Sequence, residues 1–374
     1  MKQSTRNLYI HVPFCSRRCS YCDFAIAVRR NVPVADFIDG IATEFSRRAP
    51  TLNVAKLDTL YFGGGTPSKL GSAGISGIID RLKSLDHFQL ADGAELTIEA
   101  NPEDINEASA AAWVAAGVNR LSVGVQSFDP RVLEWMHRSH SASSTAAAIS
   151  AAKSAGITDI SLDLIFALPS ELNRDWQADL DQALALNPTH LSLYGLTVEP
   201  HTPLGKWTAR GEVEEAPEDR YADEFLAAHA TMTAAGFDHY EVSNFGRPNR
   251  HSRHNSSYWQ RVPYLGLGPS AHSFDGSERR WNEREYEAWR ERTAREDPVG
   301  GAETLDAENE IAELVYLGLR TTTGLELRET DAATVNSWVA NGWATVALDR
   351  VTLSIEGWLR LDSLAADLTS ARSR

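Results

Sequence analysis

Short apolar runs alternate with longer amphipathic stretches through the first two-thirds of the chain. The apolar runs predict strands at residues 7–12, 57–62, 95–100, 120–125, 159–165 and 190–194. The stretches between them predict helices at 34–49, 105–116, 141–155 and 173–186. Gly117 and Gly156 stand where helix C-caps are expected. This alternation predicts right-handed βαβ units and a parallel sheet, either open or closed into a full or partial barrel.

The pattern changes after about residue 200. Residues 217–235 predict one more helix, whereas residues 244–282 are rich in Asn, Ser, Arg, Gly, Pro and aromatic residues, so we expect them to be irregular. Two helices near 305–319 and 325–341 are followed by two alternating runs, 344–348 and 350–355, which predict a small winged-helix-like domain. We therefore divide the chain into a core at 1–240, an irregular extension at 241–300 and an accessory domain at 301–374.

Composition and charge narrow the class of protein. The 374 residues are 43% hydrophobic and 23% charged, which is typical of a folded globular protein. The 36 Lys and Arg against 51 Asp and Glu give a net charge of −15, which argues against nucleic acid as a partner even for a winged domain. The first 14 residues contain no apolar signal segment, and no run of eighteen apolar residues occurs. We expect a cytoplasmic protein without a transmembrane segment, and peripheral membrane contact stays open.

The three cysteines form one compact motif, C-x3-C-x2-C, directly after the first predicted strand: Cys15, Cys19 and Cys22. An odd number without a distant partner excludes a disulfide framework. Three thiolates can bind three irons of a [4Fe–4S] cluster and leave the fourth iron open to a chelating ligand. The alternative is structural zinc with His11 as the fourth ligand. Zinc ligands usually come as two separated pairs, so the compact spacing favours the cluster.

The residues around the cysteines resemble a known family. The segments Tyr9-Ile-His-Val-Pro-Phe-Cys15 and Cys19-Ser-Tyr-Cys22-Asp-Phe24 resemble the cluster loop of radical S-adenosylmethionine (SAM) enzymes, in the oxygen-independent coproporphyrinogen III oxidase-like family. The match continues, in order, through Gly63-Gly-Gly-Thr-Pro67, Glu99-Ala-Asn-Pro102, Gly124-Val-Gln-Ser-Phe128, Asp163-Leu-Ile165 and Leu168-Pro169. The resemblance implies an α/β fold with a partial (β/α)6 TIM-like barrel, a [4Fe–4S] cluster, reductive cleavage of SAM, and an electron donor such as flavodoxin or ferredoxin.

The resemblance also assigns residues to the SAM site. It implies that Gly64, Gly65 and Thr66 hold the amino-acid end of SAM, and residues without a Cβ let the backbone approach a ligand closely. It implies that the nucleoside is positioned by Tyr9, Tyr21, Glu99, Gln126, Arg138, Asp163 and Gly195. Several of these residues stand near the C-terminal ends of predicted strands, which is the face that carries the active sites of α/β barrels.

Two branches of this family differ in function. The dehydrogenases oxidatively decarboxylate two propionates in porphyrin biosynthesis, whereas a haem-chaperone branch binds haem and delivers it to acceptor proteins. Here the third cysteine is followed by Asp23 and Phe24, where the dehydrogenases usually have another cysteine two residues on. Only eight residues precede Tyr9, whereas the dehydrogenases have a longer N-terminal arm. We therefore expect a haem chaperone without coproporphyrinogen oxidase activity. An oxygen-independent coproporphyrinogen III dehydrogenase is the alternative.

A second motif favours the chaperone branch. The segment His254-Asn-Ser-Ser-Tyr-Trp259 matches the HNxxYW pattern of that branch. Imidazole is a common axial ligand of haem iron, and the adjacent aromatic pair would cover the porphyrin face. A histidine in a polar loop is more often only hydrogen-bonded, but this one follows the radical SAM core. We predict that His254 is an axial haem ligand, and that the partners are haem and haem-acceptor proteins.

Overall fold

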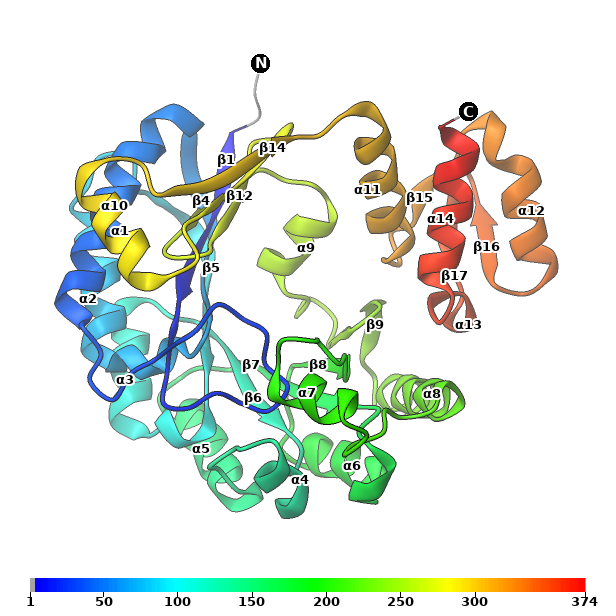
Figure 1. The fold of residues 1–374 in the computed structure, drawn as a ribbon, viewed down its shortest axis with the longest axis horizontal. Coiled ribbons are helices and arrows are strands. Elements are labelled where there is room, and N and C mark those ends of the chain that lie inside the picture. The colour runs from blue at the N-terminus through cyan, green and yellow to red at the C-terminus, as the bar shows by residue number, and fades with distance from the viewer. Residues whose placement is uncertain (1–3, 374) are drawn as a thin grey trace.

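A curved parallel sheet forms the centre of the molecule (Figure 1). The computed structural model describes residues 4–373. In order of hydrogen bonding, the six strands of the predicted barrel pair in parallel and are β1 (Thr5–Val12), β4 (Val54–Gly64), β5 (Leu90–Ala100), β6 (Arg120–Gln126), β7 (Asp159–Phe166) and β8 (His190–Gly195). Each corresponds to a predicted strand. The sequence of parallel strands and helices confirms the α/β fold with a partial (β/α)6 barrel.

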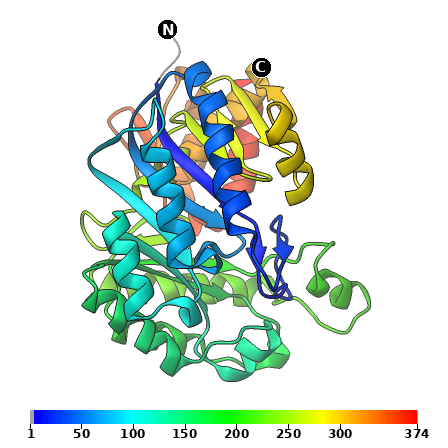
Figure 2. The same ribbon diagram turned by 90° about the vertical axis from the view of Figure 1, so that its left-hand side faces the viewer.

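Helices connect these strands and cover the outside of the barrel, as Figures 1 and 2 show. They are α1 (Val34–Arg48), α2 (Gly71–Lys83), α3 (Glu107–Ala116), α4 (Pro130–Trp135), α5 (Ala142–Ser154) and α6 (Trp176–Ala185). Asn106 and Ser141 begin α3 and α5 with capping boxes, and Gly117 ends α3 at a φ of +107°. Because helices cover one face of the sheet, strand residues such as Leu8 and Ile98 are completely buried.

The segment 241–300 is not irregular, and this expectation was wrong. It contains the end of β9 (Asp238–Glu241), then β10 (Asn244–Gly246), α9 (Arg253–Trp259), β11 (Tyr264–Leu267), β12 (His272–Phe274), β13 (Glu278–Asn282), α10 (Tyr286–Arg295) and the start of β14 (Val299–Thr304). β11 pairs with β1 and continues the barrel sheet, while β10 pairs with β8 at the opposite edge. These strands have three to six residues, too few to show a clear alternating pattern. They form because an existing sheet edge offers unpaired backbone groups.

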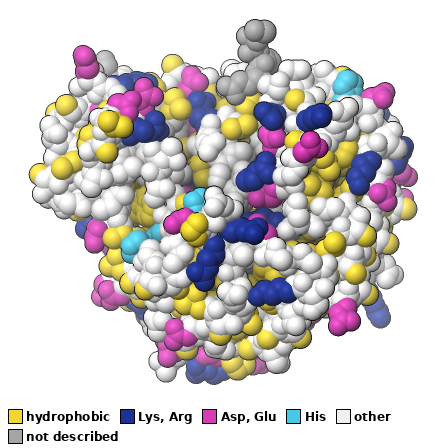
Figure 3. Space-filling view, turned by 180° about the vertical axis from the view of Figure 1, so that it is seen from behind, with side chains coloured by type: hydrophobic (Ala, Val, Ile, Leu, Met, Phe, Trp, Pro, Cys, Tyr) yellow, Lys and Arg dark blue, Asp and Glu magenta, His cyan; other side chains and the backbone are white. Residues whose placement is uncertain are grey.

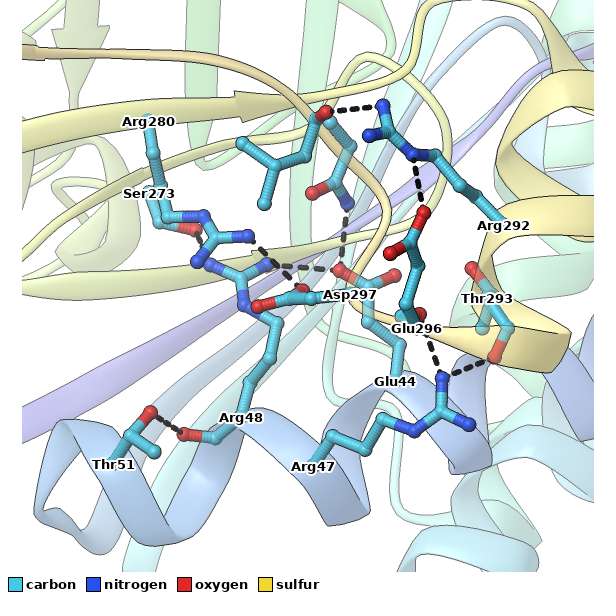
Figure 4. A network of polar contacts seen from close by, with 12 residues as sticks. Glu44, Arg47, Arg48, Thr51, Ser273, Arg280, Arg292, Thr293, Glu296 and Asp297 are labelled. Atoms are coloured by element: carbon cyan, nitrogen blue, oxygen red, sulfur yellow. Dashed lines mark hydrogen bonds and ion pairs between the residues drawn. The ribbon is translucent and has the colours of Figure 1, made fainter.

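A buried polar network joins α1 to this segment (Figure 4). The carboxylate of Glu44 accepts hydrogen bonds from Arg48 Nη1 at 2.8 Å, Trp289 Nε1 at 2.9 Å and the backbone N–H of Gly268 at 2.9 Å. A Cβ at position 268 would lie 2.5 Å from the backbone oxygen of His11. The network therefore fixes a tight turn against the end of β1, immediately before the cysteine loop.

The C-terminal elements lie to one side of the barrel (Figure 1). They are α11 (Ala307–Leu319), β15 (Leu325–Glu326), α12 (Ala332–Ala340), β16 (Ala344–Ala347), β17 (Arg350–Leu353), α13 (Ile355–Trp358) and α14 (Leu361–Arg372). A three-stranded sheet in the order β15-β17-β16 packs with these helices, which agrees with the predicted winged-helix-like arrangement. Residues 240 and 300 lie inside β9 and β14, so the predicted domain boundaries do not coincide with the ends of elements.

On the face in Figure 3, Lys and Arg side chains are interspersed with Asp and Glu. Such mixing does not provide the continuous basic area that a polyanion would need. Among residues 4–373, no helix is both long and apolar enough to cross a membrane.

Candidate functional site

A cavity of about 570 Å³ opens at the C-terminal ends of the parallel strands. It brings together all the predicted site residues except Tyr9 and His254: Cys15, Cys19, Tyr21, Cys22, Gly64, Gly65, Thr66, Glu99, Gln126, Arg138, Asp163 and Gly195. These residues come from the cysteine loop and from the ends of β4 to β8 with the segments that follow them. The parallel strands thus place side chains that are far apart in sequence in one wall, as barrels do.

The cysteine loop closes one side of this cavity. It begins with β2 (Phe14–Cys15) and returns through β3 (Ala27–Val28), which pairs with β2 in parallel. Figure 2 shows this small pair projecting beside α7 (Pro203–Ala209), and the backbone N–H of Leu204 donates to the oxygen of Ser20 at 2.9 Å. The loop is therefore held from both the N-terminal strand and α7.

The three cysteines line the cavity from one loop. Among the described residues, no group of three or more His, Cys, Asp or Glu is placed to hold one metal ion. Both ring nitrogens of His11 are engaged elsewhere, with the Tyr9 hydroxyl at 3.2 Å and the Ala25 oxygen at 2.9 Å. The structure therefore gives the zinc alternative no fourth ligand at His11.

Burial opposes ionisation of the Cys15 thiol. Burial raises the pKa of the Cys15 thiol to about 11, although a hydrogen-bond contact with Thr66 Oγ1 at 3.3 Å opposes this effect. Arg138 Nη1 lies 3.7 Å from Cys19 Sγ. A thiolate in this loop needs positive charge beside it, and Arg138 supplies part of that charge.

The glycine run after β4 is fixed by close contacts on both sides. Gly64 has a φ of +110°, and a Cβ there would lie 2.6 Å from the His11 ring. A Cβ on Gly65 would lie 2.6 Å from the oxygen of Pro13. Its backbone N–H donates to Val12 at 2.8 Å. Only glycine allows the loop to pack so closely against the end of β1 and still present its backbone to the cavity.

Two carboxyl groups face the cavity in environments that oppose their ionisation. Burial raises the pKa of Glu99 to about 7, and the nearby charge of Asp163 adds to this, while hydrogen bonds from Tyr61 at 2.8 Å and Gly64 at 3.1 Å counteract it. Burial likewise raises the pKa of Asp163 to about 6, against two 3.0 Å hydrogen bonds from Ser122. Both groups are held in place and can accept hydrogen bonds from a ligand's hydroxyl or ammonium groups.

Arg138 is anchored by residues from two neighbouring strands. Its Nη2 donates to Asn101 Oδ1 and to the Gly124 oxygen, each at 2.7 Å. Gln126 follows with a φ of +67° at a bulge between β6 and β7. Asn101 and Tyr194 also line the cavity, and neither was among the predicted site residues. Each stands at the C-terminal end of a predicted strand, which is the signal that could have identified them.

Tyr9 lies in a second cavity, not in the first. This cavity of about 340 Å³ is lined by Tyr9, His11, Asp23, Phe24, Ala25, Gly64, Glu99, Tyr258, Tyr264, Ser270, His272 and Arg284. Asp23, Phe24, Gly64 and Glu99 line both cavities. The two cavities are therefore neighbours with a shared wall.

His254 lies behind the second cavity, on helix α9 and not in a polar loop. Its exposed fraction is 1%, and its Nδ1 and Nε2 lie 2.6 Å from Thr59 Oγ1 and 2.7 Å from the Tyr258 hydroxyl. Tyr258 lines the cavity, whereas the Arg320 guanidinium covers the ring of Trp259 at 4.2 Å. The expectation that the two aromatic residues form one covering face was wrong, because successive helical residues point in different directions.

Comparisons with known proteins agree with this architecture. Residues 9–183 match the model of the Radical SAM superfamily. Coproporphyrinogen III oxidase (HemN) from Escherichia coli has the same fold, with a TM-score of 0.82 and 22% identity over 98% of this chain and 91% of that one. The fold and site thus define a radical SAM protein.

Sequence relatives identify the branch. The heme chaperone HemW of Mycobacterium tuberculosis is 37% identical over 368 residues, which cover 96% of this chain and 94% of the relative. HemW of Escherichia coli is 36% identical over 267 residues, 71% of this chain and 69% of the relative. The chain belongs to the HemW family.

Proposed function

We propose that this protein is a haem chaperone that holds a [4Fe–4S] cluster, SAM and haem, and transfers haem to acceptor proteins. The observation that carries the proposal is the position of the HNxxYW helix α9, whose Tyr258 lines a cavity that shares a wall with the predicted SAM site. The names of the HemW relatives support the same function. Its setting would be the cytoplasm, with flavodoxin or ferredoxin as the class of electron donor.

The cysteine loop would hold the cluster, and the first cavity would hold SAM. Cys15, Cys19 and Cys22 would ligate three irons, and SAM bound at the fourth would supply radical chemistry once the cluster is reduced. Gly64 and Gly65 line this cavity, and their backbone would contact the amino-acid end of SAM. The contribution of the protein is to orient this end and to exclude water.

Polar side chains of the first cavity would position the rest of SAM. Glu99 and Asp163 would accept hydrogen bonds from its ammonium or ribose groups, since both carboxyls are already fixed by neighbouring donors. Arg138 would balance the charge of the thiolates from its place beside Cys19. Tyr21, Gln126 and Gly195 line the same cavity and would complete the nucleoside site.

His254 would supply an axial ligand to haem iron. Burial lowers the pKa of its imidazole to about 3, so the ring is neutral at physiological pH and retains a lone pair for a metal. In the structure this nitrogen lone pair is engaged by hydrogen bonding, and binding therefore requires a local rearrangement.

The test is anaerobic reconstitution followed by parallel assays for haem binding, haem transfer and coproporphyrinogen consumption. We expect saturation near one haem per chain, sensitivity of the Soret band to His254→Ala, and transfer to an apoprotein. SAM should shift the EPR signal of the reduced cluster. Stoichiometric loss of the propionates of coproporphyrinogen under reducing conditions would instead establish the alternative, a coproporphyrinogen III dehydrogenase. An unsaturable haem titration would indicate hydrophobic adsorption and contradict the proposal.

A further inference from the structure

The hydroxyl of Tyr258, a residue that lines the second cavity, is hydrogen-bonded to Nε2 of His254. Tyr258 is one helical turn after His254 on α9, and its hydroxyl lies 2.7 Å from Nε2. Tyr258 lines the cavity, whereas His254 is not among the lining residues. The side chain that engages Nε2 therefore borders the cavity.

The hydrogen bonds around His254 determine which nitrogen bears the proton. Thr59 has one hydroxyl proton, which it donates to Asn7 Oδ1 at 2.8 Å. Its oxygen therefore accepts from His254, so the imidazole proton is on Nδ1, 2.6 Å away. Nε2 is then the nitrogen with the free lone pair, and it accepts from the Tyr258 hydroxyl. A metal ligand needs this lone pair, so the tyrosine proton and an iron atom compete for the same site.

The imidazole itself is held firmly. The carboxylate of Glu95 accepts from the backbone N–H groups of Arg253 and His254, each at 3.0 Å, and so fixes the start of α9. The ring stacks on Tyr61 with centroids 4.9 Å apart and an interplanar angle of 23°. Tyr258 is less enclosed, because its ring is half-buried and borders the cavity. Of His254 and Tyr258, we therefore expect Tyr258 to be the side chain that turns aside.

The cavity beside Tyr258 is lined by both aromatic and charged residues. Tyr9, Tyr258 and Tyr264 are among the lining residues, and the carboxyl groups of Asp23 and Glu99 also line it. Arg284 is an exposed cation among the lining residues, and a guanidinium is suited to binding a carboxylate. A porphyrin with its propionates toward Arg284 would satisfy both features.

We propose that haem enters this second cavity and that the Tyr258 hydroxyl is a gate on its ligand. The iron bonds to His254 Nε2 only after the Tyr258 side chain turns away, and this proposal rests on the proposed haem-chaperone function. In this step the neutral Nε2 donates its lone pair to iron, a weak ligand such as water leaves the iron, and Tyr258 keeps its proton. No oxidant or reductant is required.

The gate predicts that Tyr258→Phe binds haem more tightly than the unsubstituted chain. Removing the competing hydrogen bond frees Nε2, and one such bond corresponds to roughly a three- to tenfold gain in affinity. The experiment titrates the anaerobically reconstituted full chain with ferric haem, and separately with metal-free protoporphyrin, which cannot bond to the imidazole. We expect Tyr258→Phe to strengthen binding of ferric haem only and to preserve its histidine-ligated spectrum.

Two further variants distinguish the effect of the cavity lining on porphyrin binding from the effect of the Tyr258 hydroxyl on the iron ligand. Tyr264→Phe is the matched control, because Tyr264 lines the same cavity with its ring 4.7 Å from that of Tyr258, and no hydrogen bond to His254 is found for it. It should affect both porphyrins equally. Arg284→Gln should weaken both porphyrins, since it removes a carboxylate partner but no iron ligand. In the unsubstituted chain, the observed rate of haem binding should reach a plateau with rising haem concentration, and Tyr258→Phe should remove this plateau.

The possible results distinguish the gate from the function. If His254→Ala loses the histidine-ligated spectrum while Tyr258→Phe leaves ferric-haem affinity unchanged or lower, the gate is wrong and the chaperone function stands. If the unsubstituted chain binds weakly but Tyr258→Phe binds through His254, the gate is supported. If neither chain binds ferric haem, both the gate and the proposed function are overturned. A binding rate that rises linearly with haem concentration in the unsubstituted chain also contradicts the gate.

Discussion

The backbone N–H of Gly64 donates a hydrogen bond of 3.1 Å to the carboxylate of Glu99. This bond joins the glycine run after β4 to the end of β5, two elements that the proposed function assigns to SAM binding. The same carboxylate accepts from the Tyr61 hydroxyl at 2.8 Å. Glu99 thus supports the loop as well as facing the cavity, so substitutions at either residue should affect both ligand binding and stability.

Gly64→Ala should abolish SAM binding and lower the free energy of unfolding by about 1–3 kcal/mol. The new Cβ would lie 2.6 Å from the His11 ring, at a backbone φ of +110°. Gly156→Ala is the matched control, because Gly156 has a φ of +105° with no atom within 4 Å of its Cβ position. It should carry a similar backbone strain without losing SAM. Calorimetric titration measures the binding, and a Gly64→Ala variant with parental affinity would contradict the assigned role.

Glu99→Gln should flatten the dependence of stability on pH. Burial raises the pKa of Glu99 from 4.5 to about 7 in the folded chain, so the folded state binds more protons than the unfolded state between these values. Stability from this group therefore falls as the pH rises from 4.5 to 7, and the penalty is complete above 7. Asp163, with a pKa near 6, acts in the same direction. Thermal unfolding of SAM-free protein from pH 5 to 8 tests this against Glu107→Gln, an exposed carboxyl on α3. Equal slopes in the two variants would rule out the burial argument.

Replacing any of Cys15, Cys19 or Cys22 with alanine should prevent full cluster assembly. The reconstituted parent should contain about four irons and four sulfides per chain, because each thiolate holds one iron of the cube. Ser16→Ala is the control, because Ser16 is an exposed residue of the same loop, and this variant should retain the iron and sulfide content of the parent. Iron and sulfide analysis under anaerobic conditions gives the result. A fully loaded Cys19→Ala variant would show that another residue serves as ligand.

Glu44→Ala should lower the free energy of unfolding by about 3–5 kcal/mol, because it leaves the buried Arg48 without its charge partner. The exposed pair of Arg131 and Asp129 offers a comparison, and Arg131→Ala should change stability little, since water screens it. Urea unfolding of both variants measures the difference. Similar midpoints would mean that the network around α1 has little effect on stability.

The pattern of the sequence determined the parallel strands and the cofactor motifs, because both depend on residues close together in the chain. Long apolar runs such as those of β1 and β4 are typical of strands in a parallel sheet, because helices cover such a sheet and exclude water from it. The cysteine spacing and the glycine run likewise lie within single loops. The order of these strands then places Glu99 and Asp163 in one cavity, which barrel topology alone predicts.

Tertiary structure alone decided the surroundings of His254 and the form of the segment 241–300. The strands β11 and β12 are too short to be recognised individually, and they exist because β11 pairs with the edge of β1 and β12 then pairs with β11. His254 is buried because Thr59 and Glu95, from β4 and β5, bond its ring and its backbone. Thr59 lies 195 residues before His254 in the sequence, and Glu95 lies 159 residues before it. The local composition predicts a polar loop at His254. Hydrophobic patterning cannot predict burial of this imidazole, because the polar groups that form its hydrogen bonds are distant in the sequence.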